Sequence, residues 1–129
     1  MDVPMNQKIF MAQYECIKKL AEQESCIIVG RCADYALKDM PGLVSVFISA
    51  DMDFKIKRVI EMYGCDEVKA KDIINKTNKK RASYYNFYSN KKWADSRSYN
   101  LCINSSVVGI ENAADLIIQF MNLKLNKKD

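Results

Sequence analysis

The stretch Ser25-Cys26-Ile27-Ile28-Val29 is a continuous apolar run, and Gly30 and Arg31 follow it directly. A short run of this kind, ended by glycine, is typical of a strand buried on both faces of a parallel sheet. Arg31 would then lie at the carboxyl end of the strand, where open parallel sheets bind their ligands. A guanidinium there can hold a phosphate by two parallel hydrogen bonds, or it can pair with a carboxylate such as Asp34. The residues alone leave both interpretations open.

Further segments of regular structure extend this pattern. Residues 44–48 and 100–104 are apolar runs of strand length, so we expect three parallel strands, with Arg31 and Asn104 at the carboxyl edge of the sheet. Helical patterns alternate with the strands over about residues 7–23, 31–38, 51–63 and 67–85. A last helix would face the core with Ile110, Ala113, Ala114, Ile117, Ile118 and Met121. This alternation predicts an α/β fold with a three-layer parallel sheet.

Composition and charge limit the class of protein. The 129 residues are 49% hydrophobic and 28% charged, which suits a single domain over residues 1–129, or part of one. No apolar run approaches the roughly 20 residues that cross a bilayer, and no secretory signal follows Met1. We therefore expect a soluble cytoplasmic protein with no membrane partner. The net charge of +4 favours anionic ligands only weakly.

The chain contains no histidine, and its five cysteines are scattered singly, at positions 16, 26, 32, 65 and 102. We expect no zinc site and assign no metal ligands, and an odd number of cysteines in a reducing compartment argues against disulfides. Cys26 and Cys102 lie inside apolar runs, where a thiol behaves as a small buried hydrophobe. Without histidine, catalysis must depend on carboxylates, cations, hydroxyls or a bound metal.

A basic arm extends over about residues 66–92. Gly64 suits the left-handed end of the helix before it, and Asp66 can cap the helix that follows. Cations and aromatic residues of the arm and the residues after it are Lys76, Lys79, Lys80, Arg81, Tyr84, Tyr85, Phe87, Tyr88 and Trp93. The run could stack bases of single-stranded nucleic acid, close over nucleotide phosphates, or form a solvated face leading into a packing cluster. Arg81 lies one turn past Thr77 and Asn78, so the three could face one ligand.

A phosphate-binding loop needs two closely spaced glycines followed by lysine and a hydroxyl residue. The four glycines of this chain, at positions 30, 42, 64 and 109, are isolated. By itself the chain is therefore not expected to be a complete ATP-using enzyme.

Five motifs follow one another along the chain. They are Cys26-Ile27-Ile28-Val29-Gly30-Arg31-Cys32-Ala33-Asp34-Tyr35, Val46-Phe47-Ile48-Ser49-Ala50, Lys79-Lys80-Arg81-Ala82-Ser83-Tyr84-Tyr85, Trp93-Ala94-Asp95 and Tyr99-Asn100-Leu101-Cys102-Ile103-Asn104. In this order and spacing they resemble the cytidylate kinase-like family of P-loop phosphotransferases. The resemblance covers about residues 7–121.

The resemblance implies a nucleoside-monophosphate kinase fold, in which ATP passes its γ-phosphoryl group to a CMP-like acceptor while Mg²⁺ bridges the phosphates. By that analogy Arg31 contacts the acceptor nucleotide, and Asp34 orients the nucleotide or Arg31. Arg81 extends from a closing lid to the phosphates as a catalytic cation. Lys80 and Arg58 are further candidates for the same neutralisation of charge.

The chain departs from the family's pattern in two ways. Asn78 stands where members usually carry an aspartate that contacts the acceptor. The family's first two strands and its phosphate loop are absent, so we expect an incomplete sheet in which residues 25–29 and 44–48 lie about 10 Å apart with unpaired edges. Either another polypeptide supplies the N-terminal strands, or the chain is a fragment or shortened gene product, or the strands pair differently.

Three functions follow as hypotheses. The first is the acceptor-binding and lid portion of a cytidylate kinase-like phosphotransferase, with ATP and Mg²⁺ as cofactors for which no complete site exists in this chain, and with the isolated chain inactive. The second is a non-catalytic interaction protein that completes its sheet with a partner. The third is a nucleic-acid-binding module that uses residues 76–88, although nucleic acid is the less expected ligand.

Overall fold

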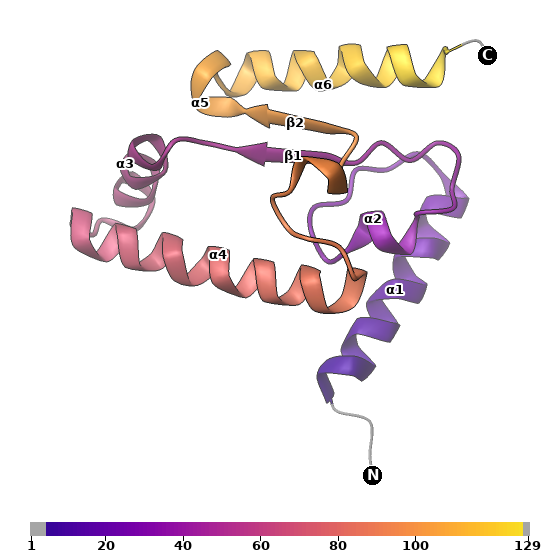
Figure 1. Ribbon diagram of the computed structural model, residues 1–129, viewed down its shortest axis with the longest axis horizontal. Helices are drawn as coiled ribbons and strands as arrows, with labels where there is room; N and C mark the ends of the chain where they lie inside the picture. The colour runs from indigo at the N-terminus through magenta and orange to yellow at the C-terminus, as the bar shows by residue number, and fades with distance from the viewer. Residues whose placement is uncertain (1–4, 128–129) are drawn as a thin grey trace. The chain divides into compact units, whose positions relative to one another are not determined.

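A computed structural model describes residues 5–127 of the chain. The chain divides into two compact units, Met1–Leu43 and Val44–Asp129. The elements, labelled in Figure 1, are α1 (Met5–Gln23), α2 (Ala33–Ala36), β1 (Val46–Ser49), α3 (Met52–Tyr63), α4 (Glu67–Ser89), the 3₁₀ turn η1 (Ser96–Ser98), β2 (Leu101–Asn104), α5 (Ser105–Val108) and α6 (Ile110–Leu125). Within residues 5–127, no helix is both long and apolar enough to cross a membrane.

In the second unit, β1 and β2 form a two-stranded parallel sheet. Their register runs from Val46 opposite Leu101 to Ser49 opposite Asn104, and the two arrows point the same way in Figure 1. The backbone N–H of Ser45 donates to the side-chain oxygen of Asn100 at 3.0 Å, just before the paired residues begin. The parallel pairing predicted for these two segments is therefore confirmed, and Asn104 lies at the carboxyl edge.

The third predicted strand, residues 25–29, is wrong for the described chain, because this segment has no regular structure. Ile27 is 94% exposed and Val29 is 87% exposed, while Ile28 packs against the core of the first unit. A strand exists only when a neighbour pairs with its backbone groups, and neither β1 nor β2 is that neighbour. The apolar run thus marks a segment with strand character that the described residues leave unpaired.

The first unit is held together by α1 and α2. Along α1, Phe10 and Ile17 are buried, and Tyr14 and Ala21 are half-buried, which is one face of a helix with 3.6 residues per turn. Ile17 packs against the buried side chains of α2 and of the residue that follows it, Ala33, Ala36 and Leu37. Only Ala33–Ala36 of the predicted helix 31–38 is helical.

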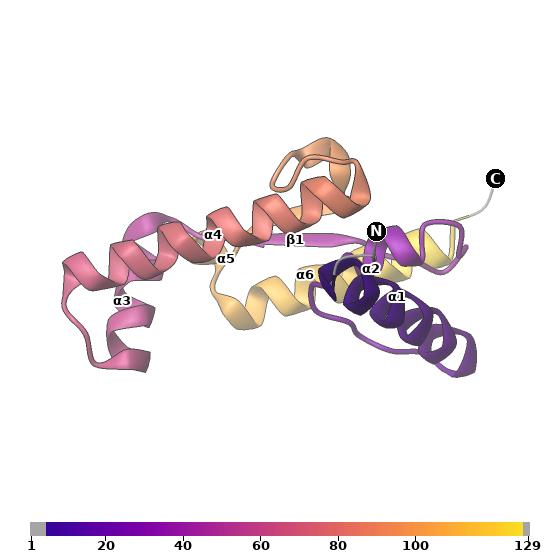
Figure 2. The same ribbon diagram turned by 90° about the horizontal axis from the view of Figure 1, so that it is seen from below.

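The α3–α4 hairpin, shown in Figures 1 and 2 with α3 beside the N-terminal half of α4, belongs to the second unit and has its own small core. Ile56, Ala70 and Ile74 form this core. The helix boundaries match the predicted caps: Gly64 ends α3 in the left-handed conformation, with φ 64°, and the Asp66 carboxylate accepts the backbone N–H of Lys69 at 2.8 Å. Each cap satisfies backbone groups that the helix itself cannot.

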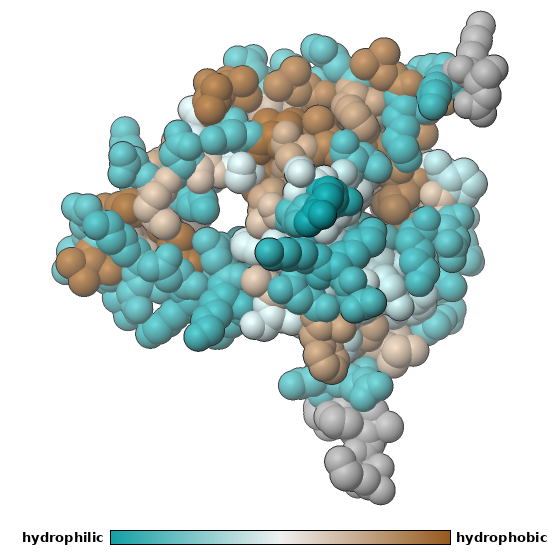
Figure 3. Space-filling view, in the orientation of Figure 1, coloured by the Kyte–Doolittle hydropathy of each residue, from teal (hydrophilic) through white to brown (hydrophobic). Residues whose placement is uncertain are grey.

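Helix α6 lies along β2 and is only partly covered. Of its six predicted core residues, Ala113 is buried and Ile117 half-buried, whereas Ile110, Ala114, Ile118 and Met121 are exposed, because two strands offer too little sheet to bury them. Figure 3 shows apolar side chains gathered over α6 and the sheet. An open groove of about 460 Å³ runs between β2 and α6, lined among others by Leu101, Ile103, Val107, Leu116, Phe120 and Leu123.

Candidate functional site

Arg31 stands on a turn of unusual backbone conformation in the first unit. Gly30, Arg31 and Cys32 have successive φ values of 71°, 58° and 54°. The left-handed region is natural for glycine but costs a residue with a side chain about 1–2 kcal/mol. The Cys32 side chain is buried, and Ala36 donates its backbone N–H to the Cys32 carbonyl at 3.1 Å, so the turn is fixed from the inside. Arg31 itself is exposed, and the turn holds it at the surface.

Asp34 occupies the first turn of α2, three residues after Arg31. It is half-buried, and one carboxylate oxygen accepts the backbone N–H of Tyr35 at 2.9 Å. Burial, reinforced by the negative charge of Asp34, raises the pKa of the Cys32 thiol from 9.0 to about 11. Asp34 is therefore close to the strained turn, as an orienting role would require.

The cysteines differ from expectation. Cys26 and Cys102, predicted to be buried, are exposed, and the buried thiol is Cys32. Cys26 lies in the unpaired segment and Cys102 on the open sheet, so the apolar surroundings that the sequence suggests are absent from the described chain. With its raised pKa, Cys32 remains a neutral thiol at physiological pH and is not a nucleophile.

Three consecutive cations of α4 are uncompensated. Further back along the helix, Lys71 pairs with Glu67 at 3.3 Å and Lys76 pairs with Asp72 at 3.1 Å. Within residues 5–127, the exposed side chains of Lys79, Lys80 and Arg81 have no ion-pair partner. Positive charge without a matching carboxylate favours the binding of an anionic ligand.

Asn78 and Arg58, the other candidates of the second unit, lie on α4 and α3. Asn78 is half-buried and stands three residues before Arg81, so the two share a side of α4. Arg58 is exposed and stands over the ring of Phe54, 5.8 Å from its centroid. Each unit thus contributes its own set of candidates. The convergence of Arg31 and Arg81 on one ligand stays a prediction.

The carboxyl edge of the sheet is closed by side-chain hydrogen bonds. The Asn104 amide donates to Asp51 at 3.0 Å and accepts the backbone N–H of Ser106 at 3.1 Å. Ser106 Oγ accepts the backbone N–H of Asp51 at 2.9 Å, and Ser105 Oγ donates to the Ser49 carbonyl at 3.0 Å. These bonds tie the starts of α3 and α5 together, so Asn104 serves to organise this edge.

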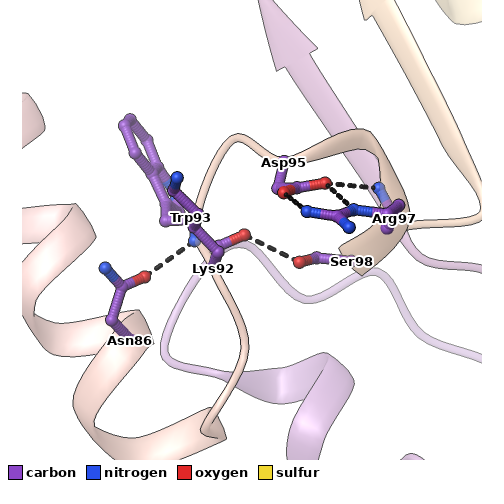
Figure 4. Close-up of polar contacts among 6 residues, drawn as sticks. All are labelled: Asn86, Lys92, Trp93, Asp95, Arg97 and Ser98. Atoms are coloured by element: carbon purple, nitrogen blue, oxygen red, sulfur yellow. Dashed lines mark hydrogen bonds and ion pairs between the residues drawn. The ribbon is translucent and has the colours of Figure 1, made fainter.

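The sequence did not reveal how the C-terminal half of α4 is held. Residues 90–99 fold back along it, as Figure 4 shows: Asn86 accepts the backbone N–H of Trp93 at 2.7 Å, and Ser98 Oγ donates to the Lys92 carbonyl at 2.7 Å. Arg97 donates from its side chain and its backbone to Asp95, which holds the pKa of that carboxyl well below its usual range. The aromatic run was visible in the sequence, but its partners were not.

Comparison with known proteins identifies the fold's relatives. Residues 1–107 match the cytidylate kinase-like family, more than half of the chain. The chain belongs to the cytidylate kinase-like family. All six predicted site residues lie inside the matched region, whereas the whole of α6 lies beyond it. The family assignment made from the five motifs is therefore confirmed.

One solved structure is similar over most of this chain. The crystal structure of an uncharacterized protein from Eubacterium ventriosum ATCC 27560 is 43% identical, with a TM-score of 0.87 over 92% of this chain and 68% of that one. No protein with a curated description matches the chain. The family match therefore indicates a kinase-like domain, and the solved structure adds no specific function.

Proposed function

We propose that this cytidylate kinase-like chain forms the acceptor-binding and lid portion of an ATP:nucleotide phosphotransferase, with a CMP-like acceptor. The observation that carries the proposal is the uncompensated group Lys79, Lys80 and Arg81, which lies on α4 inside the region matched to the family. Arg31, held at the surface by its strained turn, supplies a second phosphate-binding group. The three-layer sheet of a nucleoside-monophosphate kinase is part of this proposal.

Each residue has a role that its chemistry suits. Arg31 grips the acceptor phosphate by two parallel hydrogen bonds, and Asp34 orients that guanidinium or the nucleotide. Arg81 and Lys80 neutralise the charge that spreads over the phosphate oxygens during transfer, with Arg58 as a further cation. Asn78 offers an amide to the acceptor where the family's usual residue offers a carboxylate.

ATP and Mg²⁺ belong to this reaction, but the residues present do not fit them. No glycine-rich phosphate loop occurs in the sequence, and the described residues contain no group of three or more carboxylates, cysteines or histidines placed to hold a metal. We assign neither group a ligand in this chain. The isolated chain is therefore proposed to bind nucleotide without turning it over.

A partner polypeptide that completes the sheet is the remaining part of the proposal. Ile27 and Val29 expose apolar side chains on an unpaired segment, and the groove between β2 and α6 is lined mainly by apolar residues. Parallel sheets are normally covered on both faces, so surfaces of this kind favour a further strand and helix. We place this role in the cytoplasm, where the five free thiols would remain reduced.

Calorimetric titration with CMP tests the acceptor site. We expect Arg31→Ala and Arg81→Ala each to weaken binding by about tenfold or more, as for loss of a charged hydrogen bond. Lys76→Ala is the matched control, because it removes the same charge from α4 but from a cation already paired with Asp72. Equal losses in all three variants would contradict a specific site.

A coupled assay tests the second part of the proposal. The purified chain should show no ATP hydrolysis and no CMP phosphorylation above a blank. Turnover that Arg81→Ala abolishes would show that the chain is a complete enzyme.

Nucleic acid is a second candidate, favoured by the same cations together with the exposed ring of Phe87 further along α4. Binding of a short single-stranded oligonucleotide would then weaken with salt at a logarithmic slope of about −0.7 per neutralised phosphate. Tight oligonucleotide binding that is indifferent to Arg31→Ala would overturn the nucleotide-lid proposal. Binding of neither ligand would favour the interaction protein.

A further inference from the structure

Two separate attachments hold α4 within the second unit. Its N-terminal half packs against α3 through Ala70 and Ile74. Its C-terminal half is held by Tyr85 and Ser89, the other two buried residues of the helix. Between Ile74 and Tyr85 no residue of α4 is buried, and this intervening span carries Lys79, Lys80 and Arg81.

The second attachment is a chain of aromatic rings. Tyr85 stacks on Tyr99, with centroids 5.8 Å apart and planes 25° from parallel. Tyr99 in turn packs on Phe47 of β1 at 5.0 Å, and Trp93 meets Phe47 edge-on at 5.2 Å. Aromatic pairs of this geometry contribute about 0.5–1.5 kcal/mol beyond their buried area. The rings therefore connect α4 to the sheet.

Hydrogen bonds also join the same end of the helix to the residues that follow it. Asn86, next to Tyr85, accepts the backbone N–H of Trp93 at 2.7 Å, and Ser89 Oγ accepts the backbone N–H of Lys91 at 3.1 Å. Asn90 ends the helix in the left-handed conformation, with φ 56°. Because Trp93 also packs on Phe47 of β1, the bond to Asn86 is a second link between this end of α4 and the sheet.

Arg81 lies one turn before this attachment. Residues four apart share a side of a helix and are separated by about 6 Å along the axis. Arg81 therefore stands on the side of α4 that Tyr85 turns toward Tyr99 and β1. Figure 3 shows an opening between α4 and β1 on this side of the hairpin.

We propose that Tyr85 and Tyr99 are positioning residues for Arg81, fixing the rotation of α4 so that this guanidinium meets the acceptor phosphate. The inference rests on the proposed function, in which Arg81 binds that phosphate. The stack acts through the helix and does not itself touch the nucleotide. Loss of the stack should therefore weaken contact with the phosphate and leave contact with the nucleoside unchanged.

The test compares CMP with cytidine, which differ only by the phosphate, in calorimetric titrations of the full chain. For the wild type we expect CMP to bind at least about tenfold more tightly than cytidine, as a charged hydrogen bond to the phosphate would give. Tyr85→Leu and Tyr99→Leu should each reduce this ratio by about fivefold or more, while the affinity for cytidine stays the same. A purely structural role would lower both affinities together or neither.

Control variants separate the stack from a general effect of removing a ring. Tyr85→Phe keeps the stacked ring and should keep the wild-type ratio. Phe87→Leu removes an exposed ring of the same turn and should also keep it. On an Arg81→Ala background, Tyr85→Leu should not reduce the ratio of CMP to cytidine affinity further, because the effects of two residues that act through one contact are not additive.

Each outcome bears on the proposal. A wild-type ratio of tenfold that survives both Tyr85→Leu and Tyr99→Leu would overturn this inference and leave the proposed function intact. A wild type that binds CMP no better than cytidine would overturn the proposed function and, with it, the role of Tyr85. If Tyr85→Leu does not fold, judged by circular dichroism and by the fluorescence of Trp93, Tyr99→Leu and Asn86→Ala decide by the same ratio.

Discussion

The α3–α4 hairpin satisfies its backbone groups and buries its apolar side chains more completely than the sheet region does. The hairpin is capped at Gly64 and Asp66 and buries Ile56, Ala70 and Ile74 in a core of its own. The sheet consists of two strands, and the neighbouring α6 exposes most of its apolar side chains. Helices satisfy their backbone groups from within, whereas a strand needs a neighbour. The hairpin, which depends on local sequence, is therefore well packed, whereas the sheet region, which depends on pairing between strands, leaves apolar side chains exposed.

The largest expected effect on stability comes from truncating a buried isoleucine of the hairpin, compared with truncating an exposed isoleucine of residues 25–29. Ile74→Ala should lower the free energy of unfolding by about 2–4 kcal/mol, because it leaves a cavity. Ile27→Ala should change it by less than about 0.5 kcal/mol, since that side chain is already in water. Urea denaturation of the purified chain measures both, and a similar loss for the two variants would mean that residues 25–29 are buried in solution.

A smaller effect is expected from the cap that begins α4. Asp66→Ala should destabilise the chain by about 1 kcal/mol, because the backbone N–H of Lys69 loses its acceptor. Asp66→Asn keeps a capping oxygen and should retain most of the stability. Thermal unfolding followed by circular dichroism distinguishes the two, and identical losses would show that charge matters here more than the hydrogen bond.

The strained turn in the first unit offers a test of comparable or smaller size. Arg31→Gly should be more stable than Arg31→Ala by about 0.5–1 kcal/mol, because relief of the left-handed strain exceeds the entropy that glycine adds to the unfolded chain. Both variants should lose CMP affinity equally. Urea denaturation gives the stability difference, and equal stabilities would place residue 31 outside the left-handed region in solution.

Near physiological pH the smallest expected effect is the dependence of stability on pH, which becomes appreciable only above about pH 9. The Cys32 thiol loses its proton near pH 9.0 when unfolded and near pH 11 when folded, so between these values the unfolded chain binds fewer protons. The stabilisation of the folded chain that follows from this difference in pKa is fully present below pH 9 and is lost as the pH rises toward 11. Comparison of the wild type with Cys32→Ala isolates this stabilisation, and parallel curves of stability against pH for the two would contradict the raised pKa.

At pH 8, exposed Cys26 and Cys102 should react with a thiol reagent well before Cys32.

What the sequence predicts follows the same division. The helix ends at Gly64 and Asp66 were predictable because each has a local signature, whereas the parallel pairing around Val46 and Leu101 and the family were predictable from the order of apolar runs and motifs along the chain. The state of residues 25–29 was not predictable, because an apolar run indicates that a segment can be buried as a strand but does not indicate whether a pairing strand is present.

The candidate site was predictable only as a set of residue types. The basic run of α4 was evident, but which cations remain uncompensated depends on the i,i+4 pairs that Lys71 and Lys76 form with Glu67 and Asp72. The attachment of Tyr85 to Tyr99 joins residues from separate elements, and Phe47 is more distant still along the chain. Contacts of this kind have no signature in a single sequence, because they arise only when the fold brings the rings together.

The exposed segment around Ile27 and Val29 also bears on the fate of the chain after synthesis. An exposed, uncharged stretch of β-branched residues outside any sheet is a template for intermolecular pairing. Chaperones and proteases recognise such segments, so the lifetime of the chain in the cell would depend on how quickly this stretch is covered. Light scattering against concentration, with Ile27→Lys for comparison, would show how strongly that stretch drives self-association.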